Sequence, residues 1–333
     1  MRANSKTPAT LRRPRRSRRL FLAIDIGGTK VEVGLITPNG KMIFSARRPM
    51  IAAGTANEGL RAVRDAVNQV MTHSRAKEVR AIGVSVPGWI DGKAGKVLKA
   101  ANLPCWRNYP LAKKLRHSFG LPTRIGNDAN SAAMAEARWG AGRRYQDFFY
   151  VSLGTGIGTG IVQRKCRNGH SVSSEGGHMT INFHGPLCPC GKRGCIEMYA
   201  SGKALARRAK HLITGRGARN SLLAKFAKEN PGEINAELIG RAAAAGDALA
   251  GRIIEEACDH LAIWLGNIID LLEPEAIVIG GGLGRLILSH VARIRKQLKI
   301  SAINPRQDAV QIVSARFGSQ SALLGAAALW LQK

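Results

Sequence analysis

The chain has 333 residues, 45% of them hydrophobic and 5% aromatic, which is enough apolar material for two domains or one large two-lobed unit. Its 51 lysines and arginines outnumber 22 acidic residues, and the net charge of +29 attracts polyanions without selecting among them. No uncharged apolar run reaches the roughly 18 residues that a membrane span needs, and the N-terminus lacks the apolar core of a signal peptide. Six cysteines are too few for a disulfide scaffold. The sequence therefore predicts a cytoplasmic protein with no membrane partner and no specific nucleic-acid partner.

Residues 1–19 hold eight basic side chains and no acidic one. This arginine-rich, low-complexity composition predicts a disordered basic tail. It suits a nucleic-acid arm and equally suits residues upstream of the true start.

Residues 20–36 predict two strands joined by a tight glycine turn, Asp25-Ile26-Gly27-Gly28-Thr29-Lys30. Glycines without a Cβ let backbone N–H groups approach a phosphate closely, and Thr29 adds a hydroxyl. Asp25 is suited to face a magnesium ion through water. A plain glycine hairpin is the alternative interpretation.

A helix is predicted from about Asn57 to His73, a strand ending at Gly88, an irregular stretch at residues 101–106 and a helix over residues 110–119. Asn127 and Asp128 then stand before a helix of small residues that ends near Trp139. Both are ordinary N-cap residue types. The alanines of the first turns indicate that another segment packs closely there.

Residues 147–163 repeat the opening pattern, with a strand, the turn Gly154-Thr155-Gly156-Ile157-Gly158, and a second strand. Two glycine-rich turns about 130 residues apart predict an internally duplicated α/β fold that holds phosphate between its halves. Neither turn has the Gly-Lys-Ser/Thr of a P-loop, and neither runs directly into a helix as a Rossmann fingerprint does.

A cluster of metal-ligand types follows, with Cys188, Cys190 and Cys195 on a glycine- and proline-rich loop and His178 ten residues upstream. Three thiolates and one imidazole are a full tetrahedral set for a structural zinc ion. On spacing alone His170 and His184 compete as the fourth ligand. The flanking carboxylates Glu175 and Glu197 are left for another task, since four ligands already close a zinc site.

The remainder is mostly helical, with helices predicted over residues 204–212, 234–245, 248–272, 285–298 and 319–331 and strands over 276–283 and 310–313. The strand over 276–283 contains Gly280-Gly281-Gly282 and precedes a helix. Bare backbone of this kind can lie against a base or ribose.

Five segments together resemble the ROK family (repressors, open reading frames and sugar kinases) over residues 21 to about 332. They are DIGGTK (25–30), NLPCW (102–106), NDAN (127–130), LGTGIGTG (153–160) and the cysteine segment from Gly177 to Glu197. The resemblance implies a two-lobed actin/hexokinase-like ATPase fold of duplicated ribonuclease H-like units with an inserted zinc loop. It divides the chain into a small α/β domain, 20–127, and a large α/β domain, 128–317, with the zinc loop and dimerisation helices. The C-terminal helix, 318–333, is expected to pack back on the small domain.

The resemblance also implies roles for individual residues. Asp128 matches the catalytic base, and the zinc ligands match His178, Cys188, Cys190 and Cys195. The sugar contacts match Asn102, Asn127, Asp128, Glu175, His178 and Glu197. The nucleotide is expected at Asp25, Gly27, Gly28, Thr29, Lys30, Gly154, Thr155, Gly156 and Gly158, with adenosine near Gly280, Gly281 and Gly282.

Within the family the sequence is most similar to bacterial ATP-dependent glucokinases. This implies ATP-dependent phosphorylation of a hexose, glucose first, at its 6-hydroxyl, with ATP, Mg²⁺ and structural Zn²⁺ as cofactors and a homodimer as the assembly. Alternatives are another hexose or an N-acetylhexosamine as acceptor, and polyphosphate as donor. A transcriptional repressor is remote, because about 20 residues before the first turn are too few for a helix-turn-helix domain.

Overall fold

The structure is a computed structural model that describes residues 19–331 apart from 164–169, 216–217, 219–220 and 230–233. The predicted basic tail, 1–19, therefore lies outside the described residues except for Arg19. Among the described residues no helix combines the length and apolar character that crossing a membrane requires.

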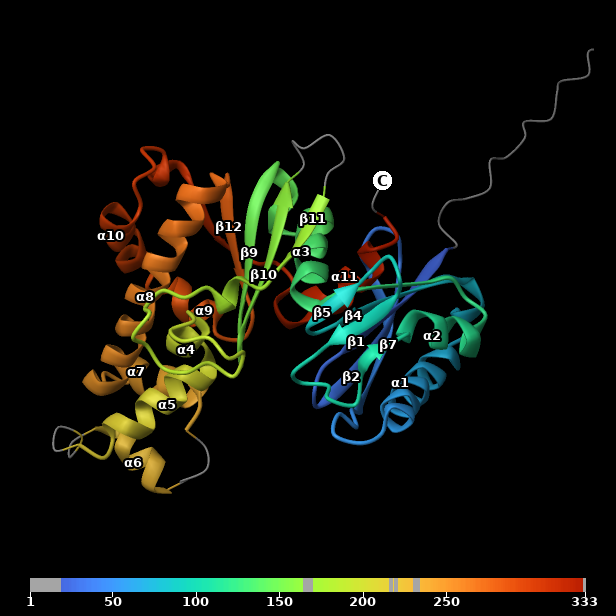
Figure 1. Cartoon of the computed structure of the whole chain (residues 1–333), viewed down its shortest axis with the longest axis horizontal. Coiled ribbons are helices and arrows are strands. Elements are labelled where there is room, and N and C mark those ends of the chain that lie inside the picture. The colour runs from blue at the N-terminus through green and yellow to red at the C-terminus, as the bar shows by residue number, and fades with distance from the viewer. Residues whose placement is uncertain (1–18, 164–169, 216–217, 219–220, 230–233, 332–333) are drawn as a thin grey trace, which may run out of the picture.

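Two five-stranded sheets form the two halves of the molecule (Figure 1). In each sheet the first three strands in spatial order are antiparallel and the last two continue parallel to the third. This shared order confirms the duplication expected from the two glycine turns. The first sheet runs β3 (Met42–Pro49), β2 (Lys30–Ile36), β1 (Leu20–Ile26), β4 (Val79–Val86) and β8 (Thr123–Asn127). The second runs β11 (His170–Ser174), β10 (Ile157–Gln163), β9 (Asp147–Leu153), β12 (Ala276–Gly280) and β13 (Gln311–Ser314).

The first half is covered on one face by α1 (Ala56–Met71) and α2 (Leu111–Phe119). Helix α1 starts with a capping box, in which the Thr55 hydroxyl accepts from the Glu58 N–H and the Glu58 carboxylate accepts from the Thr55 N–H. Its apolar residues recur at helical spacing and pack into the sheet. A small sheet that the sequence did not predict lies beside these helices, formed by β5 (Trp89–Asp91), β6 (Lys96–Lys99) and β7 (Arg107–Tyr109).

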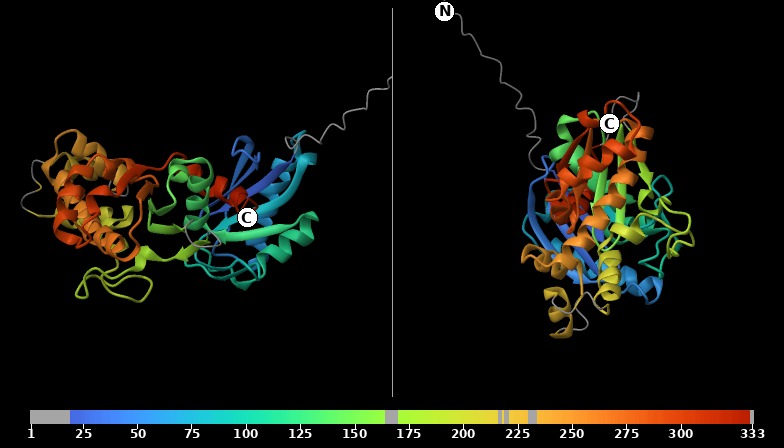
Figure 2. Two further views of the ribbon diagram at one scale, coloured as in Figure 1. Left: turned by 90° about the horizontal axis from the view of Figure 1, so that it is seen from above. Right: turned by 90° about the vertical axis from the view of Figure 1, so that its left-hand side faces the viewer.

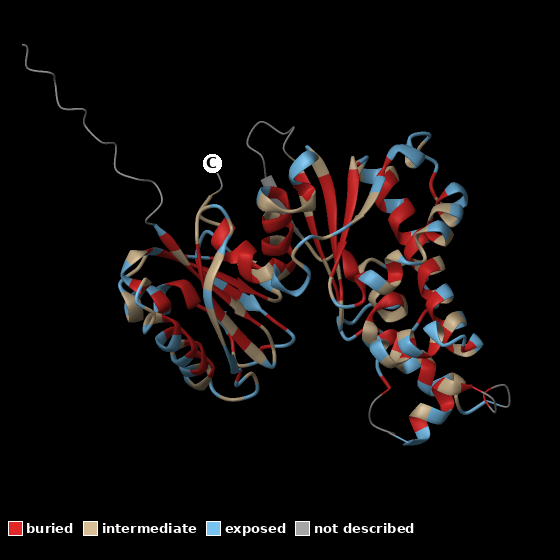
Figure 3. Cartoon of the chain, turned by 180° about the vertical axis from the view of Figure 1, so that it is seen from behind, coloured by how far each residue is buried: buried red, intermediate tan, exposed pale blue. Residues whose placement is uncertain are grey.

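Two helices of small residues lie between the sheets, α3 (Asp128–Trp139) and α11 (Ser321–Ala328) (Figures 1 and 2). A Cβ on Gly325 would be 1.8 Å from the Ser131 carbonyl oxygen, so α11 and α3 approach backbone to backbone. A Cβ on Gly83 of β4 would be 1.8 Å from the Ala326 carbonyl oxygen. Helix α11 therefore packs against both α3 and the first sheet, and both helices are largely buried (Figure 3).

The second half is mainly helical after β11. Its 25-residue helix α8 (Ala248–Leu272) has the bounds that its apolar pattern predicts. The others are α4 (Glu197–Ala200), α5 (Gly202–Leu212), α6 (Leu222–Glu229), α7 (Ala236–Ala244), α9 (Gly284–Leu288) and α10 (Val291–Ser301).

The single helix predicted over residues 285–298 is wrong, because the chain breaks it at Ser289 and His290 into α9 and α10. The Ser289 hydroxyl donates to the Leu286 carbonyl at 2.7 Å, and His290 Nδ1 lies 3.1 Å from the same oxygen. Side chains that bond a backbone carbonyl in this way compete with the helical ladder.

Candidate active site

Asp25 lies near the carboxyl end of β1, between Glu32 of β2 and Ser85 of β4. Burial raises the pKa of Asp25 to about 7, and the neighbouring Asp128 carboxylate adds to the rise, while Ser85 and Lys30 oppose it. Two acidic groups from the first half of the chain therefore face each other.

The first glycine turn packs against Asn102. The Gly27 N–H donates to the Lys30 carbonyl at 2.8 Å and closes the turn. A Cβ on Gly28 would be 2.8 Å from the Asn102 carbonyl oxygen, so this position needs glycine. Asn102 and Thr29 are exposed here, where a bound molecule can reach them.

Asp128 is the first residue of α3, directly after β8. Asn127 caps the helix, because its Oδ1 accepts from the Asn130 N–H at 3.1 Å while its Nδ2 donates to the Gly88 carbonyl at 3.0 Å. Asn127 thus has a structural role as the N-cap of α3, separate from its predicted contact with a sugar. Asp128 Oδ1 accepts from the Ala129 N–H at 2.8 Å, and burial raises the pKa of the Asp128 carboxyl. A carboxylate of this kind is a suitable proton acceptor.

The second glycine turn links β9 to β10. Its Gly154 N–H donates to the Gly156 carbonyl at 3.0 Å, and the Gly154 carbonyl accepts from Gly202 of α5 at 2.8 Å. Thr155 at the tip is exposed. Gly158 also has a packing role, because a Cβ there would be 2.9 Å from the Ala129 Cβ.

Gly160 is closer still to α3, since a Cβ on it would be 2.6 Å from the Ala133 Cβ. The predicted close packing against the alanines of α3 is therefore confirmed, and the neighbours are β10 and α11.

Glu197 reaches this turn from the first residue of α4. Its Oε2 accepts from the Ile157 N–H at 2.7 Å, and a Cβ on Gly156 would be 2.4 Å from the same oxygen. Glu197 therefore supports the glycine turn in addition to any contact with a sugar.

Glu175 completes the acidic group. Burial raises its pKa; the Asp128 and Glu197 carboxylates add to the rise, and His178 lowers it. Three other predicted sugar-binding side chains, Asp128, His178 and Glu197, thus interact electrostatically with Glu175.

His178, Cys188, Cys190 and Cys195 form the predicted metal cluster, with their ligand atoms all within 4.8 Å of one another. His178 Nδ1 is 3.5 Å from Cys188 Sγ, and Cys190 Sγ is 3.7 Å from Cys195 Sγ. Zinc bond lengths of about 2.3 Å to sulfur and 2.0–2.1 Å to nitrogen give tetrahedral edges of about 3.6–3.8 Å. The donor set and spacing therefore fit a zinc ion.

His170 and His184 were the alternative candidates for the fourth metal ligand. His184 is not part of this group. The side chain of His170 lies outside the described residues.

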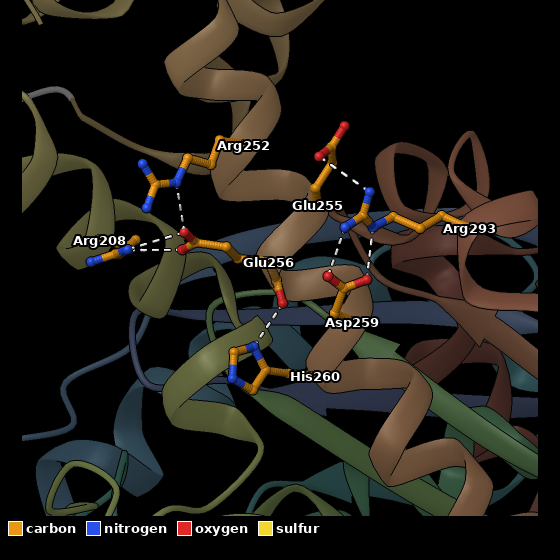
Figure 4. Close-up of polar contacts among 7 residues, drawn as sticks. All are labelled: Arg208, Arg252, Glu255, Glu256, Asp259, His260 and Arg293. Carbon is orange, nitrogen blue, oxygen red and sulfur yellow. Dashed lines mark hydrogen bonds and ion pairs between the residues drawn. The ribbon is translucent and has the colours of Figure 1, made fainter. Parts of the chain in front are cut away.

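The helices that follow the metal loop are anchored to α8 (Figure 4). Tyr199 of α4 stacks on His260 with ring centroids 4.4 Å apart, and Arg208 of α5 forms two hydrogen bonds, of 2.8 and 3.0 Å, with Glu256. The metal loop and Glu197 therefore rest on the longest helix of the second half.

A pocket of about 300 Å³ lies at the carboxyl ends of β12 and β13. Gly280 and Gly281 line it, whereas Gly282 does not. Gly281 packs on the end of β9, where the Leu283 N–H donates to the Leu153 carbonyl at 2.9 Å. The pocket therefore adjoins the second glycine turn.

Several residues that line this pocket were not predicted from the sequence. They come from α9 and from the loop between β13 and α11, and include Arg285, Ser314, Ala315, Arg316, Phe317 and Gln320. The available signal was the segment SARFGSQ, whose serines and glycine directly follow a strand; Gly318 has a φ of +53°.

Duplicated sheets joined by crossing helices, with carboxylates at the junction and glycine turns from both halves, define a two-lobed ATPase-type fold. The ROK family model matches residues 21–333, and the chain belongs to the ROK family. It is 33% identical to a glucokinase of Streptomyces coelicolor over 93% of this chain and 97% of the relative. A solved ROK family glucokinase from Streptomyces griseus in complex with glucose and AMPPNP shares 34% identity and a TM-score of 0.80. That match covers 93% of this chain and 98% of the other. These relatives confirm the expected enzyme class, a sugar kinase.

Relatives with other activities also match. An N-acetylmannosamine kinase of Escherichia coli is 31% identical over 92% of this chain and 97% of its own length. A xylose repressor of Caldicellulosiruptor bescii is 31% identical over 83% of this chain and 70% of its own length.

Proposed function

We propose that the protein transfers the γ-phosphoryl group of ATP to the 6-hydroxyl of a hexose, with glucose as the preferred acceptor. The observation that carries the proposal is Asp128, a half-buried carboxylate whose pKa is raised by burial at the start of α3, with electrostatic links to Asp25 and Glu175. Phosphoryl transfer depends on positioning and charge neutralisation, and these groups lie between two glycine turns suited to phosphate.

Asp128 accepts the proton of the sugar hydroxyl as that oxygen attacks the γ-phosphorus. The new O–P bond forms while the bond to the bridging oxygen of ADP breaks, so ADP leaves with the electron pair. Glu175 and His178 bind sugar hydroxyls in this proposal, together with Asn102, Asn127 and Glu197. Asp25 would hold a magnesium ion through water, and that ion would neutralise phosphate charge.

The metal cluster supports the sugar site in this proposal. Zinc held by His178 Nδ1 and three thiolates leaves Nε2 of the same ring available to the sugar. Burial raises the pKa of the Cys195 thiol to about 12, so the thiolate form needs a cation beside it.

ATP is preferred over polyphosphate as the donor. The pocket at Gly280 and Gly281 is concave and adjoins the turn at Gly154. It is lined by small residues, by Phe317 and by Arg285 and Arg316, which suits a nucleoside with attached phosphates. A linear polyphosphate has no base to fill it. The repressor alternative is disfavoured by the carboxylates at Asp25 and Asp128, which catalysis needs and sugar sensing does not.

The test is a panel of hexoses and N-acetylhexosamines with ATP or polyphosphate, compared by kcat/KM in a coupled assay. We expect glucose with ATP to give the highest value. A higher value for N-acetylmannosamine or mannose would reassign the acceptor, and absence of phosphorylation with every sugar would reject the kinase. We also propose a cytoplasmic homodimer, in keeping with the unpaired thiols and the family resemblance; light scattering after gel filtration measures the assembly.

A further inference from the structure

Glu136 is a charged side chain with 0% exposure, in the last turn of α3. Among the described residues it has no lysine or arginine as an ion-pair partner. A buried carboxylate without a counter-charge is costly unless hydrogen bonds surround it. Its contacts therefore indicate what it does.

Four donors from three segments converge on this carboxylate. Oε2 accepts from the Ala141 N–H at 2.8 Å and the Arg316 N–H at 3.1 Å. Oε1 accepts from the Phe317 N–H at 3.0 Å and the Ser321 hydroxyl at 3.3 Å. Hydrogen bonds to an ionised acceptor are stronger than neutral ones and fix direction.

The two N–H donors after β13 belong to the pocket proposed for adenosine. Arg316 and Phe317 line that pocket, opposite Gly280 and Gly281. The Arg316 guanidinium is anchored to the same helix, since its Nη1 donates to the Trp139 carbonyl at 3.1 Å. Both the backbone and the side chain of Arg316 are thus held by the last turn of α3.

The first turn of α3 carries Asp128. Eight residues separate Asp128 from Glu136, about 12 Å along the helix axis. Glu136 is therefore too far away to contact the reacting atoms, but it joins the wall of one pocket to the helix that positions the base.

We propose that Glu136 is a positioning residue for the phosphate donor: it holds the Arg316–Phe317 wall of the nucleotide pocket in register with Asp128. This inference rests on the proposed function. It predicts a role in nucleotide affinity and alignment and none in binding the sugar.

The test compares Glu136→Gln with the wild type and with Glu255→Gln, which removes a carboxylate of α8 that is paired with Arg293 (Figure 4). Glutamine keeps the shape but turns an NH₂ group toward N–H donors. In E136Q we expect AMPPNP to bind about tenfold more weakly by calorimetry, with a similar rise in the KM for ATP and a glucose KM within about twofold. E255Q should leave the AMPPNP affinity and both KM values unchanged.

Equal losses for nucleotide and sugar would show general misfolding and overturn the inference, as would unchanged AMPPNP affinity. If E136Q does not fold, Ser321→Ala removes one donor, and we expect about a two- to threefold rise in the ATP KM alone. An unchanged ATP KM in S321A would then reject the proposal. AMPPNP binding needs no turnover, so a wild type that binds AMPPNP without phosphorylating any sugar would fail the proposed function and not this one.

Discussion

The two halves of the molecule share strand order but differ in the residues at equivalent positions. The sixth residue of β1 is Asp25, and the sixth residue of β9 is Ser152. The helix after the last strand begins with Asp128 in the first half and with Ser321 in the second. Carboxylates therefore stand in the first half where the second half has hydroxyls.

This difference divides the labour of the proposed reaction. Proton transfer needs a carboxylate, whereas a carboxylate without a donor beside it would repel a triphosphate. At the second turn the Glu197 carboxylate accepts from the Ile157 N–H. The second half instead offers a turn of glycines and a pocket with Arg285 and Arg316 among its lining residues. The two halves thus share a strand order, and in the proposed reaction the polar residues of the first half supply the base while those of the second half supply the anion site.

Replacing the base gives the largest expected effect. Asp128→Asn keeps the shape of the helix start but cannot accept a proton, so kcat should fall about 10²–10⁴-fold. Glucose affinity, measured by calorimetry, should stay within a few-fold of the wild type. A variant with nearly normal kcat would show that the carboxylate of the first half is not the base.

Disrupting the proposed zinc site tests a feature that, among the described residues, is found in the second half alone. Cys195→Ala deletes a fully buried ligand and should lose zinc, measured by elemental analysis, with at least about a hundredfold drop in kcat/KM. The matched control is Cys105→Ala, a half-buried thiol outside the cluster, which should keep both metal and activity. A zinc-free C195A protein that phosphorylates glucose normally would separate the metal from the sugar site.

Paired glycine substitutions compare the two halves directly. A Cβ on Gly160 of β10 would be 2.6 Å from Ala133 of α3, whereas a Cβ on Gly34 of β2 would be 3.4 Å from Leu323 of α11. We expect Gly160→Ala to destabilise the protein by roughly 1–3 kcal/mol and Gly34→Ala by less than about 1 kcal/mol in urea unfolding. Equal losses would mean that the second half packs no more tightly on its helix than the first.

The last prediction concerns pH. The pKa of Asp25 is raised to about 7 from an ordinary value of 3.8, so between these values the folded state binds more protons than the unfolded state. The unfolding free energy should therefore fall as pH rises from about 4 to 7, by at most about 1.4 kcal/mol per pH unit from this group. In metal-free buffer, Asp25→Asn should flatten that slope. An unchanged slope would assign the titration to another group.

Local patterns made much of this predictable. The 3.6-residue apolar period gave α8 its bounds, and clustered soft ligands identified the metal group, because both signals lie within short stretches of chain. The alanines of α3 indicated a close neighbour without identifying it. The strands of the small sheet are only three or four residues long, too short for a clear period.

The unpredicted part of the site is non-local. Glu136 meets Arg316 and Phe317 across about 180 residues, and no spacing in the sequence connects them. From the sequence alone a glutamate in a helix is expected to be exposed, whereas the fold buries Glu136 completely. The wall of the nucleotide pocket has the same origin, since Gly280 and Phe317 meet only through the order of the second sheet.

The position of α11 has a consequence for folding kinetics. Gly83 of the first sheet packs on Ala326, and Ala23 of β1 shares a buried cluster with the same helix, about 300 residues further along the chain. Contacts of such high sequence separation close late, because long loops must be ordered before they form. During synthesis the strands of the first sheet emerge early. The face of that sheet that packs on α11 stays uncovered until α11 has been synthesised. The expected refolding intermediate therefore has a formed second half and an exposed alanine- and glycine-rich face on the first.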